Sequence, residues 1–256
     1  MKRILITGAG RRVGQALALR FGERGWQVLV HCHQSKSEAT ATADRINAAG
    51  PGKAQVVEAD LATPEGIPQL MEACRLEAPL DCVINNASLF EYDSPRNPNP
   101  ELMRRCLNVN LISPSLIAAS FYGQLEADGR NGCLINILDN KVQALNPDFY
   151  SYSLSKAAFA AASEMMAMAY GERLRVNGIA PGITLISGKQ TEESFHHAHG
   201  MNPLGRSSTL EDLVKAADFI VDTPSLNGQI LTIDGGQTLL RLPRDVAFLT
   251  KGAGFP

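Results

Sequence analysis

Short apolar runs alternate along the chain with longer segments in which apolar residues recur at helical spacing. Helical spacing is clearest over Val13–Arg24, Ser37–Ala49 and Tyr152–Tyr170. The apolar runs are Ile4–Ile6, Val28–Val30, Gln55–Val57, Cys82–Ile84, Leu134–Leu138, Val176–Ile179 and Ile230–Ile233. Apolar runs without polar alternation are typical of strands covered on both faces, and strand–helix alternation favours parallel pairing. We therefore expect an α/β fold, a doubly wound, parallel, seven-stranded sheet with helices on both faces.

Three stretches interrupt this alternation. Residues 91–100 carry three prolines, residues 181–203 begin at a Pro-Gly pair, and residues 238–256 follow the last apolar run. Prolines end strands and helices, and ligands of open α/β sheets bind beyond the carboxyl ends of the strands. The first two stretches are candidate substrate loops, with 181–203 as a substrate flap. We expect residues 1–256 to form a single domain, with 238–256 as a C-terminal tail that covers a neighbouring subunit.

Composition and charge narrow the function classes. Lys and Arg number 24 against 26 Asp and Glu, a net charge of −2, and no basic run exceeds the pairs Arg11-Arg12 and Arg104-Arg105. Nucleic acid and anionic membranes are therefore not expected partners. The short apolar start at Met1–Ile6 and the lack of a long apolar run predict a cytoplasmic protein. The five scattered cysteines form no C-x-x-C pair, so we expect reduced thiols: Cys32, Cys74, Cys82, Cys106 and Cys133.

A glycine-rich turn follows the first predicted strand and opens the first helix. It reads Thr7-Gly8-Ala9-Gly10-Arg11-Arg12-Val13-Gly14. Such a turn lets backbone approach a pyrophosphate at the positive end of a helix, although glycine-rich turns also serve simply to pack helices on strands. The candidate cofactor-binding residues here are Gly8, Arg11, Arg12 and Val13.

The end of the second strand indicates which dinucleotide is bound. The sequence there is His31-Cys32-His33-Gln34-Ser35-Lys36, without the acid that an NAD site places against the ribose 2′-hydroxyl. We therefore expect NADPH, although these residues are also compatible with a plain polar turn. The candidate cofactor-binding residues at the ends of strands two, three and four are His31, His33, Gln34, Ser35, Asp60, Leu61, Asn86, Ala87 and Ser88.

Tyr152 and Lys156 place a phenol and an ammonium four residues apart on a predicted helix, and hence on one face of it. A nearby cation favours the phenolate, so we expect Lys156 to lower the pKa of Tyr152 and to make it a proton donor that is easily reloaded. The same spacing occurs on many solvated helix faces, so it indicates a catalytic pair only in combination with the motifs around it.

Taken in order, these motifs resemble the short-chain dehydrogenase/reductase family. The resemblance runs from Thr7-Gly8 to Asp234-Gly235-Gly236 and includes Asp60, Asn85-Asn86-Ala87 and Pro181-Gly182. It implies a Rossmann-type domain in which Asn110, on a long fourth helix, supports a proton relay. It also implies that Lys156 holds the nicotinamide ribose, that Pro181 and Gly182 contact the cofactor, and that a homotetramer packs through the helices of Asn110 and Tyr152.

Two residues depart from the family pattern. Arg12 stands where a third glycine is usual, and Asp139 stands where serine is usual, thirteen residues before Tyr152. Serine donates a hydrogen bond to a substrate carbonyl, whereas an ionised aspartate only accepts. A carboxylate suits a nitrogen heterocycle, because it accepts from ring N–H or amino groups and helps to pass a proton to a C=N nitrogen. The alternative is that Asp139 only caps a helix or a turn.

This combination resembles the pteridine reductases and the bacterial dihydromonapterin reductases. The matching stretches are Arg11–Gly14, His31–Ser35, Asn85–Phe90, Ile135–Asp139 and Tyr152–Lys156. The resemblance implies that Phe90 stacks the pterin ring, that Arg12 lies beside substrate and phosphate, and that Ser88 contacts the ligands. Phe90 could instead plug its own core. Gln34 replaces an arginine that is frequent in that family, which loosens NADPH preference unless Lys36 compensates.

The sequence thus predicts an NADPH-dependent pteridine reductase acting on dihydrobiopterin, dihydromonapterin or dihydrofolate. The predicted catalytic residues are Asp139, Tyr152, Lys156 and Asn110, and the predicted substrate residues are Arg12, Ser88, Phe90, Asp139 and Tyr152. The rivals are a 3-oxoacyl-acyl-carrier-protein type ketone reductase and a non-catalytic NADPH-sensing protein. No metal is expected, because His196, His197 and His199 lack a second organised motif.

Overall fold

A seven-stranded parallel sheet forms the centre of the molecule. The computed structural model describes residues 1–63, 65–187 and 190–249. The strand order is β3-β2-β1-β4-β5-β6-β7, and every neighbouring pair is parallel. The strands are β1 (Arg3–Ile6), β2 (Gln27–Cys32), β3 (Lys53–Glu58), β4 (Cys82–Asn85), β5 (Gly132–Ile137), β6 (Leu174–Pro181) and β7 (Ile230–Ile233). The predicted doubly wound sheet is confirmed, and each strand overlaps the apolar run that predicted it.

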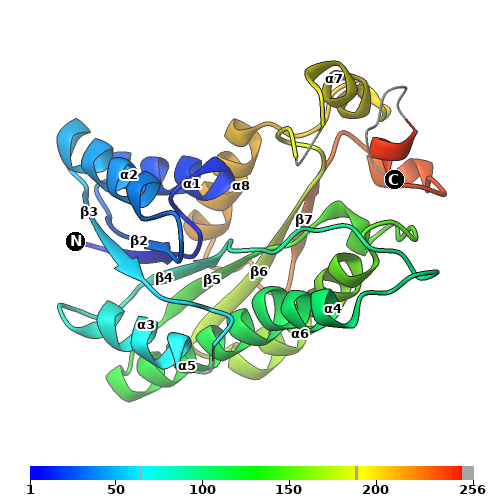
Figure 1. Ribbon diagram of the computed structural model, residues 1–256. Helices are drawn as coiled ribbons and strands as arrows, with labels where there is room; N and C mark the ends of the chain where they lie inside the picture. The colour runs from blue at the N-terminus through cyan, green and yellow to red at the C-terminus, as the bar shows by residue number, and fades with distance from the viewer. Residues whose placement is uncertain (64, 188–189, 250–256) are drawn as a thin grey trace.

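Helices cover both faces of this sheet. Figure 1 shows α1, α2 and α8 on one face and α3, α5 and α6 on the other. The helices are α1 (Arg12–Glu23), α2 (Lys36–Ala49), α3 (Gly66–Arg75), α4 (Pro100–Leu107), α5 (Ser113–Asp128), α6 (Tyr150–Tyr170), α7 (Glu192–Gly200) and α8 (Leu210–Asp222). This three-layer arrangement explains why the strands are apolar on both sides.

Successive residues of β1 show how the two cores form. Ile4 and Ile6 point into the core beneath α1, whereas Leu5 between them points into the core beneath α3 and α5. All three side chains are fully buried. The rings of Trp26, just before β2, and Phe21 of α1 pack in a T-shaped arrangement with 5.2 Å between centroids. The sheet is therefore fixed on both faces and holds the ends of its strands at defined positions.

The strand order reverses between β1 and β4, because β1 pairs with β2 on one side and with β4 on the other. The chain leaves β1 toward α1 on one face and leaves β4 toward the opposite face. Loops that diverge in this way open a crevice beyond the carboxyl ends of the strands, which is where open α/β sheets bind ligands.

The structure adds detail to three expectations about the irregular stretches, and the flap and the cover for a neighbouring subunit stay predictions. The long helix expected around Asn110 is interrupted by a π-helical turn, η1 (Asn108–Ile112), between α4 and α5. The stretch 181–203 contains the helix α7. The described part of the tail, with the short helices η3 (Gln237–Leu240) and η4 (Val246–Phe248), packs on its own subunit, while residues 250–256 lie outside the described residues. In the described residues no helix is long and apolar enough to cross a membrane.

Candidate active site

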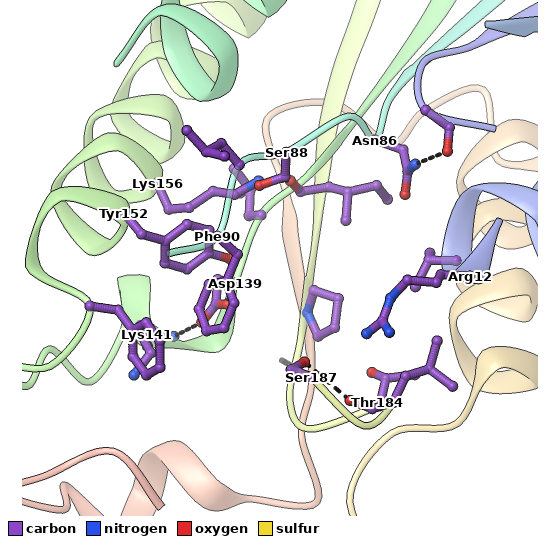
Figure 2. Close-up of a pocket in the computed structure, with 18 of the residues that line it drawn as sticks. Arg12, Asn86, Ser88, Phe90, Asp139, Lys141, Tyr152, Lys156, Thr184 and Ser187 are labelled. Atoms are coloured by element: carbon purple, nitrogen blue, oxygen red, sulfur yellow. Dashed lines mark hydrogen bonds between the residues drawn. The ribbon is translucent and has the colours of Figure 1, made fainter. Parts of the chain in front are cut away.

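A cleft of about 1080 Å³ lies beyond the carboxyl ends of the strands. Its walls come from the glycine-rich turn, the ends of β2, β3, β4 and β5, helix α6, and the segments after β6 and β7. Figure 2 shows Tyr152, Phe90 and Asp139 on one side of this cleft and Arg12 facing them from the other. The predicted cofactor-binding residues and three of the four predicted catalytic residues, Asp139, Tyr152 and Lys156, thus line one cleft, although they come from distant parts of the chain.

The glycine-rich turn comes close to the loop after β4 and leads into a helix without a side-chain cap. Gly8 has φ +64°, and a side chain there would meet the backbone of Ala87 at 3.1 Å. Helix α1 begins at Arg12 with no side-chain cap and no acid in its first turn. Its first N–H groups and its positive dipole end are therefore available to an anion beside Gly8, Arg11 and Val13, which line the cleft.

Arg12 adopts a backbone conformation that favours glycine. Its φ is +57°, in the left-handed region, which explains why a glycine is usual at this position. Its guanidinium Nη1 donates a hydrogen bond to the carbonyl oxygen of Ile186 at 2.8 Å. The exposed side chain therefore bridges the glycine-rich turn and the segment after β6, and places a fixed cation at the cleft.

His31 supports the glycine-rich turn through a hydrogen bond with Gly8. Its buried ring accepts a hydrogen bond at Nδ1 from the Gly8 N–H at 3.1 Å, and its Nε2 lies 3.1 Å from the carbonyl oxygen of Ala59. Burial lowers the pKa of His31 to about 4, so the ring is neutral at pH 7. His33 and Gln34 are exposed and Ser35 half-buried where β2 passes into α2, and all three line the cleft.

Two acids lie close to this corner: Asp60, a predicted cofactor-binding residue, and Glu58, which the sequence did not point to. Lys36 Nζ is 3.0 Å from the Glu58 carboxylate, so its cation is partly neutralised. His33 Nε2 is 3.7 Å from Asp60, whose other oxygen accepts the Ala62 N–H at 2.9 Å. Parallel pairing of β2 with β3 brings these groups together, and spacing along the chain gives no sign of it.

The residues after β4 both support the surrounding loops and line the cleft. The Asn86 side-chain amide donates to the carbonyl oxygens of Thr7 and Gly8 at 2.8 and 3.1 Å and so ties β4 to the glycine-rich turn. Ala87, being small, lets the turn approach. Ser88 Oγ donates to Asn110 Oδ1 at 3.2 Å. All three residues also line the cleft, as do Leu61, Pro181 and Gly182.

Asp139, Tyr152 and Lys156 meet at the base of the cleft. The Tyr152 hydroxyl donates to Asp139 Oδ2 at 2.7 Å, and Lys156 Nζ donates to the carbonyl oxygen of Ile137 at 2.7 Å. The other Asp139 oxygen accepts the Lys141 N–H at 2.9 Å, so Asp139 also caps the short helix η2 (Asn140–Val142). Asp139 therefore caps η2 with one carboxylate oxygen and accepts the hydrogen bond from the Tyr152 hydroxyl with the other.

Electrostatics at this base differ from the expectation for Tyr152. Burial raises the pKa of Tyr152 well above its ordinary value, and the Asp139 carboxylate raises it further. The predicted lowering by Lys156 is therefore wrong, because the phenol is desolvated and lies against an anion. Burial raises the pKa of Asp139 as well and lowers that of Lys156 to about 8. Tyr152 is a neutral hydrogen-bond donor whose proton lies between phenol and carboxylate.

Asn110 lies in the π-helical turn and is buried. Its side-chain oxygen accepts from Ser88 Oγ and the Leu89 N–H, and its amide donates to the carbonyl oxygen of Leu89 and to Ser155 Oγ, which in turn donates to the carbonyl oxygen of Tyr152. Both polar ends of the side chain are thus occupied. The residue joins the loop after β4 to α6, so its side chain positions Tyr152.

Phe90 presents a partly exposed ring to the cleft. The ring is 40% exposed, stacks on Phe149 with 4.3 Å between centroids, and meets the edge of Tyr152 at 4.7 Å. One face of Phe90 is therefore supported by protein while its position beside Tyr152 is fixed. This geometry suits a platform for a flat ligand better than a core plug.

Several residues that line the cleft were not predicted from the sequence. Lys141 and Phe149 lie two and ten residues after Asp139, and Thr184 follows Gly182. Arg244 and Asp245 come from the tail. The proximity of Lys141 and Phe149 to recognised residues is a signal that could have found them, whereas nothing in the sequence marks the tail residues. Across the described ranges no group of three His, Cys, Asp or Glu is arranged to hold a metal ion.

Fold and site together define a dinucleotide-dependent oxidoreductase. The family model for short-chain dehydrogenases matches residues 2–196, and the chain belongs to that family. Glucose 1-dehydrogenase 2 of Bacillus subtilis (strain 168) is 31% identical over 246 residues, which cover 93% of this chain and 95% of the relative.

Solved structures extend the comparison. Alternative dihydrofolate reductase 1 (FolM) of Brucella canis, complexed with NADP, is 35% identical with a TM-score of 0.84, and the match covers 93% of this chain and 94% of that one. The angucycline C-6 ketoreductase LanV with bound NADP is 27% identical with a TM-score of 0.83, covering 93% and 96%. The family uses nicotinamide dinucleotides, and both of these neighbours hold NADP.

Proposed function

We propose that the protein is an NADPH-dependent pteridine reductase that reduces dihydropterins, among them dihydrobiopterin, dihydromonapterin and dihydrofolate, to their tetrahydro forms. The observation that carries the proposal is the hydrogen bond from the Tyr152 hydroxyl to the Asp139 carboxylate at 2.7 Å, at the base of the cleft. A serine at position 139 would donate to a ketone, whereas this carboxylate would repel the carbonyl oxygen.

The chemistry of a C=N bond suits this pair. Bound NADPH supplies the hydride to the ring carbon. Asp139 accepts hydrogen bonds from the ring N–H and amino groups, which orients the heterocycle and keeps its C=N nitrogen near the phenol. Tyr152, kept neutral by burial and by Asp139, donates the proton to that nitrogen, directly or through water held by Asp139. Lys156, whose pKa is lowered to about 8 by burial, supplies a cation beneath the ribose at neutral pH.

The remaining residues of the cleft bind and orient the pterin and NADPH. The exposed face of Phe90 stacks the pterin ring, and Arg12 faces this ring from the opposite wall with a fixed cation for carbonyl or phosphate oxygen. Ser88 lines the same cleft and is held by a hydrogen bond to Asn110. NADPH is favoured by His33, Gln34 and Ser35 at the end of β2 and by the NADP that the solved relatives contain.

The decisive experiment mixes the purified protein with NADPH and, in separate reactions, dihydrobiopterin, dihydrofolate and acetoacetyl thioester, and follows loss of nicotinamide absorbance. We expect oxidation with the dihydropterins only. Asp139→Ser should lose at least about a hundredfold in kcat/KM for dihydropterin, in line with loss of a group that acts in the transition state, while NADPH affinity stays unchanged. Turnover of the thioester alone would overturn the proposal.

A ketone reductase remains the second candidate, because LanV is a ketoreductase and the relative in Bacillus subtilis is a glucose dehydrogenase. The variant that distinguishes the two candidates is again Asp139→Ser. If the protein is a ketone reductase, this variant should have higher activity toward a ketone than the wild type. A non-catalytic NADPH sensor is disfavoured by the assembled Tyr152, Lys156 and Asn110. Tyr152→Phe would leave a sensor intact and should remove most turnover from a reductase.

We further propose that the protein is a homotetramer that packs through α5 and α6. Leu116 on α5 and Met165 and Met168 on α6 are 50%, 69% and 80% exposed, although all three are large and apolar. Large apolar side chains exposed on two helices that cover the same face of the sheet favour burial against a second copy. Sedimentation of wild type and of Met165→Glu/Met168→Glu tests this, and identical masses for the two would contradict it.

A further inference from the structure

The last described residues, 241–249, close the substrate side of the cleft. We call them the C-terminal segment. Leu242, Arg244, Asp245, Val246 and Ala247 line the cleft, and Val246 and Ala247 are buried. In Figure 1 the segment is the red end of the chain, beyond the carboxyl ends of the strands and on the side of α7. None of its residues takes part in the chemistry proposed above, so its placement requires another reason.

A buried lysine connects the catalytic turn to this segment. Lys141 is 7% exposed, and its ammonium forms a close ion pair with the carboxylate of Asp245. The ammonium also lies 5.5 Å from the centroid of the Phe149 ring. The backbone N–H of the same lysine donates to Asp139 at 2.9 Å. Because lysine is almost never buried without a partner, this pairing is a specific arrangement, and it touches the catalytic carboxylate.

Asp245 orders the segment around itself. Its Oδ1 accepts the Ala247 N–H at 2.9 Å and so caps η4, and its own N–H donates to Asp148 Oδ2 at 2.8 Å. Asp148 is buried and receives two hydrogen bonds from the Arg244 guanidinium, both at 2.7 Å. Charge-assisted, two-pronged pairs of this type fix geometry as well as adding binding energy. The segment is therefore attached to both ends of the 139–149 loop.

Aromatic contacts carry this attachment to the substrate platform. The Phe248 ring lies 5.3 Å from Tyr92 and 6.0 Å from Phe149, and Phe149 stacks on Phe90. Release of the segment would remove the Phe248 contact from the Phe149 ring that supports Phe90. The position of the platform thus depends on residues about a hundred positions further along the chain, since Lys141 and Asp245 are 104 residues apart.

We propose that the ion pairs Lys141–Asp245 and Asp148–Arg244 form a clamp that fixes the C-terminal segment as the outer wall of the substrate site. Lys141 and Asp245 are then positioning residues that decide how large a group attached to the heterocycle can enter. The identity of that heterocycle rests on the proposed function, whereas the clamp itself does not.

The test combines three variants with two readouts. Lys141→Met, Asp245→Asn and the double variant each remove charge from the buried pair. Hydrogen exchange of the backbone amides of residues 245–249 should become at least about tenfold faster in both single variants, because each leaves one buried charge unpaired. The KM for dihydrobiopterin should rise about tenfold while the KM for NADPH stays unchanged. The double variant should be no worse than the worse single one, as expected for partners in one interaction.

Lys215→Met is the matched control, because Lys215 pairs with Glu211 on the exposed surface of α8 and should change neither readout. Arg244→Gln weakens the outer pair, whose arginine is 45% exposed, and serves if a buried-pair variant fails to fold. It should accelerate exchange of the same amides by a smaller factor. Unchanged exchange in these variants, or effects of the two single changes that simply add in the double variant, would overturn the clamp.

The two proposals can fail separately. If wild type binds NADPH but reduces no dihydropterin, the proposed function fails, and hydrogen exchange still decides the clamp. If dihydropterin is reduced and the clamp variants keep wild-type KM and wild-type exchange, the function stands and the clamp fails.

Discussion

Arg12 combines an unfavourable backbone conformation with an exposed cation at the cleft. A residue other than glycine at φ +57° costs roughly 1–2 kcal/mol, and this chain carries that cost where glycine is usual in its family. The hydrogen bond to Ile186 holds the side chain in the cleft. Strain retained at a binding position is a sign of selection for the side chain.

The first prediction compares Arg12→Gly with Arg12→Ala. Both remove the cation, but only glycine relieves the backbone, so the glycine variant should be more stable by about 1 kcal/mol in urea unfolding. Both should raise the KM for dihydropterin by about tenfold or more. Equal stability of the two variants would show that the left-handed conformation carries no strain.

His31 gives a prediction on pH and stability. Its pKa is about 4 in the folded protein, lowered by burial, against an ordinary value of 6.5. The unfolded chain therefore binds more protons between these values, and stability that is complete above pH 6.5 is lost as the pH falls toward 4. The loss should reach about 3 kcal/mol, measured as the free energy of unfolding in urea across this range.

Replacing His31 with asparagine should lower stability at pH 7 but flatten the dependence between pH 6.5 and 4. The exposed His33, changed in the same way, is the control and should keep the wild-type slope. A wild-type slope in His31→Asn would mean that other groups cause the acid sensitivity.

At the scale of elements, the first turn of α6 determines where Tyr152 stands. The buried Asp93, from the proline-containing loop, accepts hydrogen bonds from the N–H and the hydroxyl of Ser151. Phe149, just before the helix, has φ +54°. A loop distant in sequence thus supplies the carboxylate that satisfies the helix N-terminus one residue before the catalytic phenol.

We predict that Asp93→Ala lowers the free energy of unfolding by about 3 kcal/mol and lowers kcat more than it changes KM, because Tyr152 loses its fixed position. Asp93→Asn should recover most of both losses, since its amide oxygen still accepts the Ser151 N–H. The control is Asp212→Ala in the capping box of α8, which should cost about 1 kcal/mol and leave kcat unchanged.

Helices and strands could be predicted from the sequence where the pattern of apolar residues within a short stretch determines them. The run Ile230–Ile233 has the bounds of β7, and the helical spacing of Tyr152–Tyr170 misses only the first two residues of α6. The Tyr152 hydroxyl donates a hydrogen bond to Asp139, and the joint catalytic role of the two residues stays a prediction. The pKa direction of Tyr152 was wrong because it depends on burial. Asp245 was missed because its partner, Lys141, is 104 residues away.

For the molecule as a whole, cofactor binding is expected to stabilise the fold by mass action. A ligand at one hundred times its Kd adds about 2.7 kcal/mol, roughly 5–11 °C for a domain of this size. Because NADPH is proposed to bind more tightly than NADH, it should raise the unfolding midpoint more than NADH does at equal concentration. Glu58, 3.0 Å from Lys36, competes with a 2′-phosphate for that ammonium.

Glu58→Gln should accordingly widen the difference between the two dinucleotides, measured as midpoint shifts in thermal unfolding. Glu211→Gln removes one acid from the comparable exposed pair with Lys215 on α8 and should leave the difference as in wild type. If NADH stabilised the protein as much as NADPH does, the cofactor preference proposed for this corner would be wrong.

The clamp has a consequence for the order in which the chain becomes functional during its synthesis. Strands β1 to β4, which carry the glycine-rich turn, leave the ribosome first and are neighbours in the sheet. Residues 241–249 emerge after all seven strands, and domains fold as their chain emerges, at roughly 5–20 residues per second. A nascent chain can thus assemble its dinucleotide half before the wall of its substrate half exists. Newly made protein would take up cofactor before it can discriminate among substrates.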